Sequence, residues 1–425
     1  MEKGILLVAV LMVAGIPAFA QQGDSSRSAS DVATMEQKMK EMEERIIQLE
    51  GKVRMLESSQ TTPATAPPAA APAEQVTTAP VPSPAYGGAG GSAAKALNPD
   101  ISVIGDFIAS AGANSAPPLA SLQPFPSFQM HESEIGLQAI IDPYARGDFF
   151  ISFGEEGVDL EEGYITFTAL PHSFVVKGGK MRSVFGKVNT LHNHVLPWID
   201  RPLVTTNLVG GEDGIDDAGL SVQRIIPMPK GLFMEATGQV FRGDSGDDVS
   251  PLFKSSRSSD VSTVEHLRTY KDLTESTNLD IGLSYARGHN DLGSDFLTNL
   301  YGIDATLRWK PLRRSIYHSF VGRSELIWSQ RQEQFTEQRS FGFYASGDYQ
   351  LGRRWFLGGR YDQSERARFA NLTDKGGSAV LTYWPSEFSQ VRGQYRHTSY
   401  AEGRDANEVL FQLLFSLGAH GAHPF

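Results

Sequence analysis

The sequence predicts an all-β fold: a transmembrane antiparallel β-barrel of about 16 strands (roughly 14 to 18), preceded by an α-helical coiled coil and a disordered linker. Three observations favour this fold class. From Ile101 onward, apolar and polar side chains alternate in successive short segments. Gly, Asp, Asn, Pro or Ser separate these segments. No stretch is apolar over the roughly 20 residues that a membrane-spanning helix needs.

Residues 1–20 are typical of a secretory signal peptide. Lys3 precedes an apolar run, and Ala18-Phe19-Ala20 fits the small-x-small cleavage pattern. The apolar run has about a dozen residues, fewer than the roughly 20 that span a bilayer as a helix. We therefore expect an exported chain without a transmembrane helix.

Residues 31–58 carry a heptad repeat and predict a parallel coiled coil that assembles copies of the chain. Basic residues at position g are followed five positions later by acidic residues at position e, as in Lys38 and Glu43. The β-branched residues Ile46 and Val53 at position a favour two helices. A single amphipathic helix lying on other protein is the alternative. The apolar stripe consists of Val32, Met35, Met39, Met42, Ile46, Leu49, Val53 and Leu56.

Residues 59–97 are rich in Pro, Ala, Thr and Gly and predict an extended linker without a core of its own. At about 3.1 Å per residue this linker would reach on the order of 100 Å. The coil adds about 40 Å at about 1.5 Å per residue. Together they are long enough to cross much of a periplasm.

Residues 98–425 are expected to form the barrel. In the segment 301–309, apolar residues at odd positions alternate with Gly302, Asp304, Thr306 and Arg308. Such a strand presents one face to lipid and the other to the interior. About fifteen segments of this kind lie between 101 and 418, and because bacterial single-chain barrels close with an even number of strands, we expect 16.

Aromatic residues support a membrane barrel, because Trp and Tyr fall on the outward parity and several lie near strand ends. A soluble β-sandwich also alternates, but it rarely has so many ten-residue strands. The outward aromatics are Tyr285, Tyr301, Trp309, Trp328, Tyr349, Trp355, Tyr361 and Tyr383.

The composition excludes several classes of protein. Cysteine is absent, which excludes disulfides and thiolate metal sites. The chain has 49 acidic and 38 basic residues, which argues against a nucleic-acid partner. The sequence contains no nucleophile elbow, phosphate-binding loop or paired-carboxylate motif. We therefore predict no enzymatic activity and no cofactor.

The longest stretch of the barrel region without alternation is 183–217. Long loops in compact domains usually have a function, and in a porin such a loop can fold inward and narrow the pore. A loop packed on the extracellular rim is the alternative. Its constriction candidates are Lys187, His192, His194, Asp200 and Arg201.

Strand parity directs both basic and acidic residues into the barrel. A mixed lining gives a strong transverse field but little net selectivity, so we favour anions only weakly. Rim salt bridges are an alternative account of about half of these charges. The inward basic candidates are Arg308, Arg323, Arg354, Arg360, Arg392 and Arg396; the acidic ones are Asp304, Glu325, Asp348 and Asp362.

Four histidines are candidate metal ligands: His192, His194, His420 and His423. Their spacing matches no metal motif, and the sequence forces no carboxylate beside them. We therefore favour histidines that are hydrogen-bonded to backbone, and no metal. The acidic turn 210–217 resembles a calcium loop in composition but lacks its spacing and closing Glu.

Several short runs resemble a little-characterised Gram-negative outer-membrane family that is related to phosphate-selective porins. Some members are loosely labelled zinc-regulated or TonB-dependent receptors. The resemblance is best over about 130–245 and returns at 418–425. It implies a 16-stranded channel, assembled as a homotrimer, that passes small solutes by diffusion. The runs are Leu170-Pro171-His172, Val176-Lys177-Gly178-Gly179-Lys180, Leu191-His192-Asn193-His194, Asp200-Arg201-Pro202-Leu203 and Gly210-Gly211.

The receptor label does not fit the chain, because a TonB-dependent receptor fills a barrel of about 22 strands with a globular plug. Everything before Ile101 is signal, coil or linker by the patterns above. We expect an outer-membrane porin with a periplasmic coil, in contact with lipid and with its own copies. The alternatives are a tether between outer membrane and cell wall with a largely closed barrel, and a metal-related uptake channel.

Overall fold

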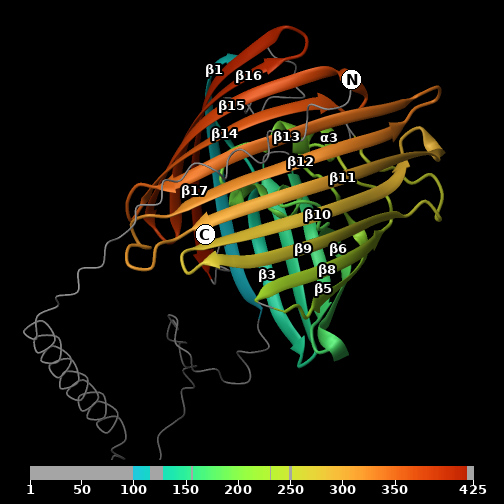
Figure 1. The fold of residues 1–425 in the computed structure, drawn as a ribbon, viewed down its shortest axis with the longest axis horizontal. Coiled ribbons are helices and arrows are strands. Elements are labelled where there is room, and N and C mark those ends of the chain that lie inside the picture. Colours follow the sequence, from blue (N-terminus) through green and yellow to red (C-terminus); the bar gives the residue numbers. More distant parts are fainter. Residues whose placement is uncertain (1–98, 115–127, 155–156, 230, 248–250, 419–425) are drawn as a thin grey trace, which may run out of the picture. The chain divides into compact units, whose positions relative to one another are not determined.

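The structure is a computed structural model that describes residues 99–114, 128–154, 157–229, 231–247 and 251–418 (Figure 1). The predicted signal peptide, coiled coil and linker lie outside the described residues, as do His420 and His423. None of the described helices combines the length and the apolar character that crossing a membrane requires.

The described part of the chain is mostly strand. Four short helical segments interrupt it: η2 (Pro171–Ser173), η3 (Val188–Thr190), η4 (Asn193–Val195) and α3 (Leu203–Leu208). The strands are β1 (Asp100–Asn114), β2 (Phe128–Met130), β3 (Ser133–Asp142), β4 (Ala145–Gly154), β5 (Gly157–Phe167), β6 (Phe174–Arg182), β7 (Asp216–Ile226), β8 (Leu232–Phe241), β9 (Ser262–Thr274), β10 (Thr277–Asn290), β11 (Gly293–Trp309), β12 (Phe320–Gln332), β13 (Glu337–Gln350), β14 (Trp355–Arg366), β15 (Phe369–Ser386), β16 (Ser389–Tyr400) and β17 (Arg404–Gly418).

The strands form a closed antiparallel ring. From β3 to β17 each strand pairs with the next one along the chain, and β17 returns to pair with β1 over Ser102–Asn114. Both β2 and β3 pair with β1, so these two segments make one interrupted strand and the ring has 16 members. Closure leaves no sheet edge with unpaired backbone groups, which a bilayer would penalise. The predicted barrel of 16 antiparallel strands is confirmed.

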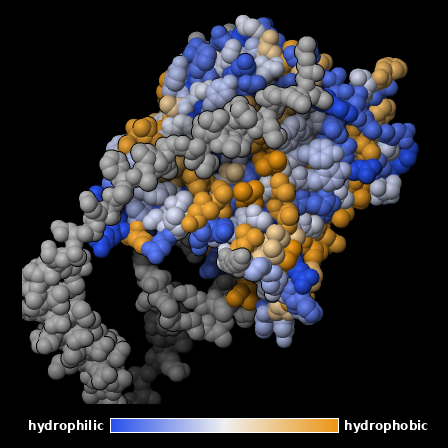
Figure 2. All heavy atoms as spheres, in the orientation of Figure 1, coloured by the Kyte–Doolittle hydropathy of each residue, from blue (hydrophilic) through white to orange (hydrophobic). Residues whose placement is uncertain are grey.

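Side chains alternate between the inside and the outside of the wall. On β11, Asp304 and Thr306 are 1% and 2% exposed, whereas Tyr301 and Ile303 are each 41% exposed. Figure 2 shows apolar side chains gathered on the outer face of the wall that is turned to the viewer. The inside-outside parity predicted for this strand is confirmed.

Outward aromatics form two rows that follow the strand register. Tyr285, Tyr301 and Trp328 face one another across β10, β11 and β12, with the two tyrosine rings 5.2 Å apart. Trp309 and Tyr349 belong to a second row, linked through β12. Eight positions separate Tyr301 and Trp309 on β11, which is about 26 Å along the strand. An apolar band edged by aromatics is the surface that transmembrane barrels present to lipid.

The two ends of the barrel differ in their connections. The turn end holds Asp100 and Gly418 together with the connections 275–276 and 387–388. The loop end holds the connections 183–215 and 242–261. In bacterial barrels the short turns lie in the periplasm and the long loops outside the cell. The connection 183–215 therefore starts from the end that corresponds to the cell exterior.

Candidate functional site: the inner loop of the barrel

We name residues 183–215, the connection between β6 and β7, the inner loop. The Val188 N–H donates to Glu325 Oε1 on β12 at 2.8 Å, while the ring of His192 lies 3.0 Å from Glu162 on β5. A segment can reach strands on nearly opposite sides of a ring only from within it. Figure 1 shows α3 of this loop enclosed by the strands. The inner loop therefore lies inside the barrel and not on its rim.

Side chains within the loop satisfy its own backbone. Asn189 closes the base: its Nδ2 donates to the carbonyls of Ser183 and Ile215, and its Oδ1 accepts from the Ile215 N–H at 2.8 Å. Arg201 donates to the carbonyls of Val188 and Leu191 at 3.1 and 2.8 Å. Buried carbonyls without such partners would be costly. The loop is thus a folded unit whose shape does not depend on the wall alone, and the buried Arg201 organises it.

Gly186 allows the loop to turn inward at its start. Its φ of 62° lies in the left-handed region, which favours glycine. A Cβ at this position would also collide with the Glu325 carboxylate. Any other residue would therefore be strained and would disturb the Glu325 carboxylate, which accepts from the N–H groups of Lys187 and Val188.

Apolar packing holds the inner loop against the wall. Trp198 and Val204 of the loop are fully buried and belong to one cluster with Ile327, Tyr344 and Val380 of the wall. The Trp198 and Tyr344 rings meet edge to face at 5.2 Å. Burial of each such side chain contributes about 1.5–3 kcal/mol. The inner loop and this part of the wall therefore share a packed core.

Asp200 is the electrostatic anchor of the loop. Its Oδ2 accepts from Arg360 on β14 at 2.8 Å and from Arg396 on β16 at 3.0 Å, and its Oδ1 accepts from Gln394. Burial raises the pKa of Asp200, but the guanidinium groups of Arg360 and Arg396 outweigh it and lower the pKa to about 2. Arg392 donates to the Trp198 carbonyl at 3.1 Å. Three of the predicted inward arginines thus bind the loop to the wall.

A second charged group lies on the wall toward the turn end. Lys187 of the loop reaches Asp280 on β10 at 3.0 Å. Arg308 lies 3.7 Å from the same carboxylate, and Arg323 pairs with Asp348. The side chains of Lys187, Arg308 and Arg323 are partly exposed and line the space beside the loop, whereas that of Asp280 is buried.

Arg354 is the one inward candidate that the structure places elsewhere. It is exposed and lies in the turn 351–354 between β13 and β14, where its carbonyl accepts from the Trp384 N–H. Counting alternate positions in the sequence extends the inward and outward pattern through a tight turn, although the strand ends before the turn. The assignment of Arg354 to an inward strand position is wrong.

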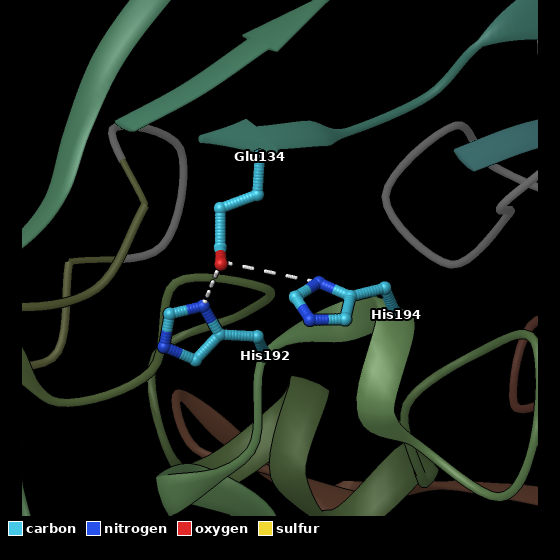
Figure 3. Close-up of side chains that lie close together, drawn as sticks. All are labelled: Glu134, His192 and His194. Atoms are coloured by element: carbon cyan, nitrogen blue, oxygen red, sulfur yellow. Dashed lines mark hydrogen bonds and ion pairs between the residues drawn. The ribbon is translucent and has the colours of Figure 1, made fainter. Parts of the chain in front are cut away.

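His192 and His194 lie beside carboxylates. Glu134 Oε2 is 2.5 Å from His192 Nδ1 and 3.9 Å from His194 Nδ1, and Figure 3 shows the carboxylate pointing toward both rings. Glu161 and Glu162 on β5 approach His192 as well, at 2.8 and 3.0 Å. The favoured account of histidines that are hydrogen-bonded to backbone does not describe His192, because both of its ring nitrogens lie beside carboxylates. The glutamates lie on β3 and β5, and successive antiparallel pairing from β3 to β6 brings these strands beside the start of the loop.

Glu134, Glu161 and Glu162 were not among the sequence candidates. One signal in the sequence pointed to them: adjacent acids at 161 and 162 break the alternation of a barrel strand. His131, Glu132 and Glu134 repeat this signal at the start of β3. Both places interrupt the polar-apolar pattern with residues that can bind metal.

The chain is similar to an uncharacterized protein of Aquifex aeolicus strain VF5, with 30% identity over 337 residues that cover 70% of each chain. No protein-family model matches the chain. Among solved structures, it resembles an anion-selective porin from Comamonas acidovorans, with a TM-score of 0.51 and 9% identity over 75% of this chain and 99% of that one. It also resembles the outer-membrane channel DcaP of Acinetobacter baumannii, with a TM-score of 0.50 and 12% identity over 75% and 96% of the two chains. These structural likenesses show the fold of porins.

Proposed function

We propose that this chain, which belongs to the same family as the Aquifex aeolicus protein, is an outer-membrane porin and not an enzyme. It would pass small hydrophilic solutes by diffusion. The observation that carries this proposal is a folded loop inside a 16-stranded barrel of the porin fold. Barrels of 16 to 18 strands are wide enough to hold an aqueous channel, and an inner loop narrows such a channel. The inner loop would set the size limit for the solute.

The side chains beside the loop support a weak preference for anions. The cationic side chains Lys187, Arg308 and Arg323 are 23%, 38% and 25% exposed, whereas Asp280 and Asp348 are 0% and 18% exposed. A solute that passes the loop would therefore meet basic groups more often than acidic ones. Because each basic group has an acidic neighbour, the net selectivity would be small.

We further place the protein among the porin-like relatives of phosphate-selective porins, on the runs 170–180, 191–194, 200–203 and 210–211. The heptad repeat 31–58 would hold a homotrimer together on the periplasmic side, since its g and e charges suit parallel helices. The turn end of the barrel, which holds Asp100, would face the same compartment.

A second candidate function is a structural tether, in which coil and linker reach the cell wall and the barrel is chiefly an anchor. The packed core around Trp198 favours this candidate, because it occupies part of the interior. The two functions differ in one measurable property, which is whether ions cross the folded barrel.

Single-channel recording of the purified protein in planar bilayers decides between them. We expect discrete conductance steps that are smaller than those of a barrel without an inner loop. In a salt gradient, we expect a small reversal potential with the sign of anion preference. Silent bilayers from protein that is folded and oligomeric would contradict the porin and favour the tether.

A further inference from the structure

Two departures from regular strand geometry bring acidic side chains and histidines to one place inside the barrel. On β5, Phe150 of β4 pairs with Glu162 and Ile151 pairs with Leu160, so Glu161 is the extra residue of a β-bulge. Consecutive residues of a regular strand point to opposite faces, whereas a bulge can turn both to the same face. Glu161 and Glu162 are accordingly both buried, and both approach His192.

The second departure is the break between β2 and β3. His131 and Glu132 fall in this break, where His131 lies 3.5 Å from Asp106 and 3.4 Å from Glu212. Glu134 then follows on β3 with its carboxylate toward the inner loop. Bulges and breaks of this kind are common beside functional sites because they re-aim side chains.

Three carboxylate oxygens converge on one imidazole ring. Oε2 of Glu134 and Oε2 of Glu161 lie 2.5 and 2.8 Å from the same atom, His192 Nδ1, and Oε2 of Glu162 lies 3.0 Å from Nε2. An imidazole has one hydrogen at most on each nitrogen, so it cannot donate to all three oxygens. Among the described residues, Oε2 of Glu161 accepts no hydrogen bond, although Glu161 is only 5% exposed. A cation at this point would bind Oε2 of Glu161, which receives no hydrogen from the ring.

The other oxygens of the two β5 glutamates are held in place from the opposite side. Arg182 donates through Nη2 to Oε1 of Glu161 at 2.8 Å, and its backbone N–H donates to Oε1 of Glu162 at 2.7 Å. This leaves both Oε2 atoms directed toward His192. Outer partners that orient ligand carboxylates in this way are a regular feature of metal sites.

His194 completes the group from the inner loop. Its ring lies 5.7 Å from that of His192, and the nearest ligand atoms of Glu134, His192 and His194 all lie within 4.8 Å of one another (Figure 3). Zinc binds imidazole nitrogen and carboxylate oxygen at about 2.0–2.2 Å, so its tetrahedral ligands stand about 3.4 Å apart. The observed separations bracket this value, and side-chain rotation would bring the three atoms to it.

We propose that Glu134, His192, His194 and Glu161 bind a divalent transition-metal ion of the zinc type. Two imidazoles with carboxylates suit zinc and the other divalent first-row transition metals, whereas calcium and magnesium prefer sites in which all ligand atoms are oxygen. The ion would join the inner loop to β3 and β5, which lie elsewhere in the ring than β14 and β16 of the Asp200 anchor. It would thus attach the loop to a second part of the wall.

The test measures Zn²⁺ binding to the purified, full-length protein. Metal is first removed by chelation and dialysis, and binding is then measured by calorimetry and elemental analysis. All variants carry His420→Ala and His423→Ala, so that the C-terminal histidines contribute nothing. We expect about one Zn²⁺ per chain, and an affinity reduced about 100-fold or more by His192→Gln, by His194→Gln and by Glu134→Gln. His266→Gln is the matched control, because His266 is also buried inside the barrel but bonds to Ser284 on β10.

X-ray absorption of the loaded protein gives a second readout, and we expect two imidazole ligands with oxygen completing the shell. The heat-dependent shift in electrophoretic mobility identifies folded barrel in each sample. If His192→Gln does not fold, His194→Gln and Glu134→Gln decide, since each removes one ligand. Equal Zn²⁺ binding by the parent and the folded ligand variants would overturn the proposal, as would Ca²⁺ or Mg²⁺ displacing Zn²⁺ at equal concentration.

Discussion

Replacing residues 184–214 by a two-residue turn is expected to raise the single-channel conductance several-fold. The inner loop occupies the interior at its own level, with Trp198 and Val204 buried among wall residues. A 16-stranded barrel without such a filling has room for an aqueous channel. Removal of the loop therefore exchanges a packed core for water.

The barrel provides the geometry for this replacement. Arg182 and Asp216 are paired residues at the ends of β6 and β7, and the Ser183 N–H donates to the Ile215 carbonyl at 2.8 Å. Two residues suffice to join paired antiparallel strands, as residues 291–292 do between β10 and β11. An Asn-Gly pair suits the replacement because it adopts the turn that matches the twist of the strands.

The control shortens the connection 310–319, which joins β11 and β12 at the turn end, and its conductance should stay close to that of the parent. An unchanged conductance in the loop deletion, from barrels that are folded, would mean that solutes pass beside the loop without restriction. A silent parent together with a conducting deletion would mean that the loop is a closed gate.

Alternation in the sequence predicted the barrel because the physics of a strand is local. A residue on β11 faces inward or outward by its parity alone, and Asp304 and Glu325 lie inside as their positions indicate. The number of strands followed from closure, which requires an even count when both ends of the chain lie at one end of the barrel. The long segment without alternation, 183–217, could be recognised in the sequence for the same reason.

The contacts of the site join residues that are far apart in the sequence, and they could not be read from it. Glu134 and His192 are 58 positions apart, and Asp200 and Arg396 are 196 positions apart. No local pattern specifies which strand faces which residue of a loop. The bulge at Glu161 also breaks the alternation of faces along β5, so alternation in the sequence does not predict that Glu161 and Glu162 share a face.

Asp200→Asn is expected to detach the inner loop from β14 and β16 without unfolding the barrel. The carboxylate of Asp200 receives hydrogen bonds from Arg360 and Arg396, and its pKa is lowered from 3.8 to about 2. A shift of about two pKa units corresponds to about 2–3 kcal/mol at pH 7. The asparagine keeps the shape of the side chain but loses this stabilisation.

Chymotrypsin cleavage after Trp198 measures the effect at neutral pH, because this buried residue is reached only when the loop opens. Cleavage that follows the open population should become about 30- to 100-fold faster in Asp200→Asn. Asp348→Asn is the control, since Asp348 pairs with Arg323 on β12, and its cleavage rate should stay within a few-fold of the parent. Equal rates in Asp200→Asn and the parent would contradict the role of Asp200 as an anchor.

The dependence on pH distinguishes loss of the charge from a change in packing. Because the pKa of Asp200 is lower in the folded protein, its contribution is complete above pH of about 4 and disappears as the pH falls through about 2. The difference in stability between the parent and Asp200→Asn, measured by thermal unfolding, should therefore be constant from about pH 7 to 5 and shrink toward zero near pH 2. A difference that persists at its full size at pH 2 would assign the effect to packing around Trp198 and Ile199, because most of the contribution of the charge has then disappeared.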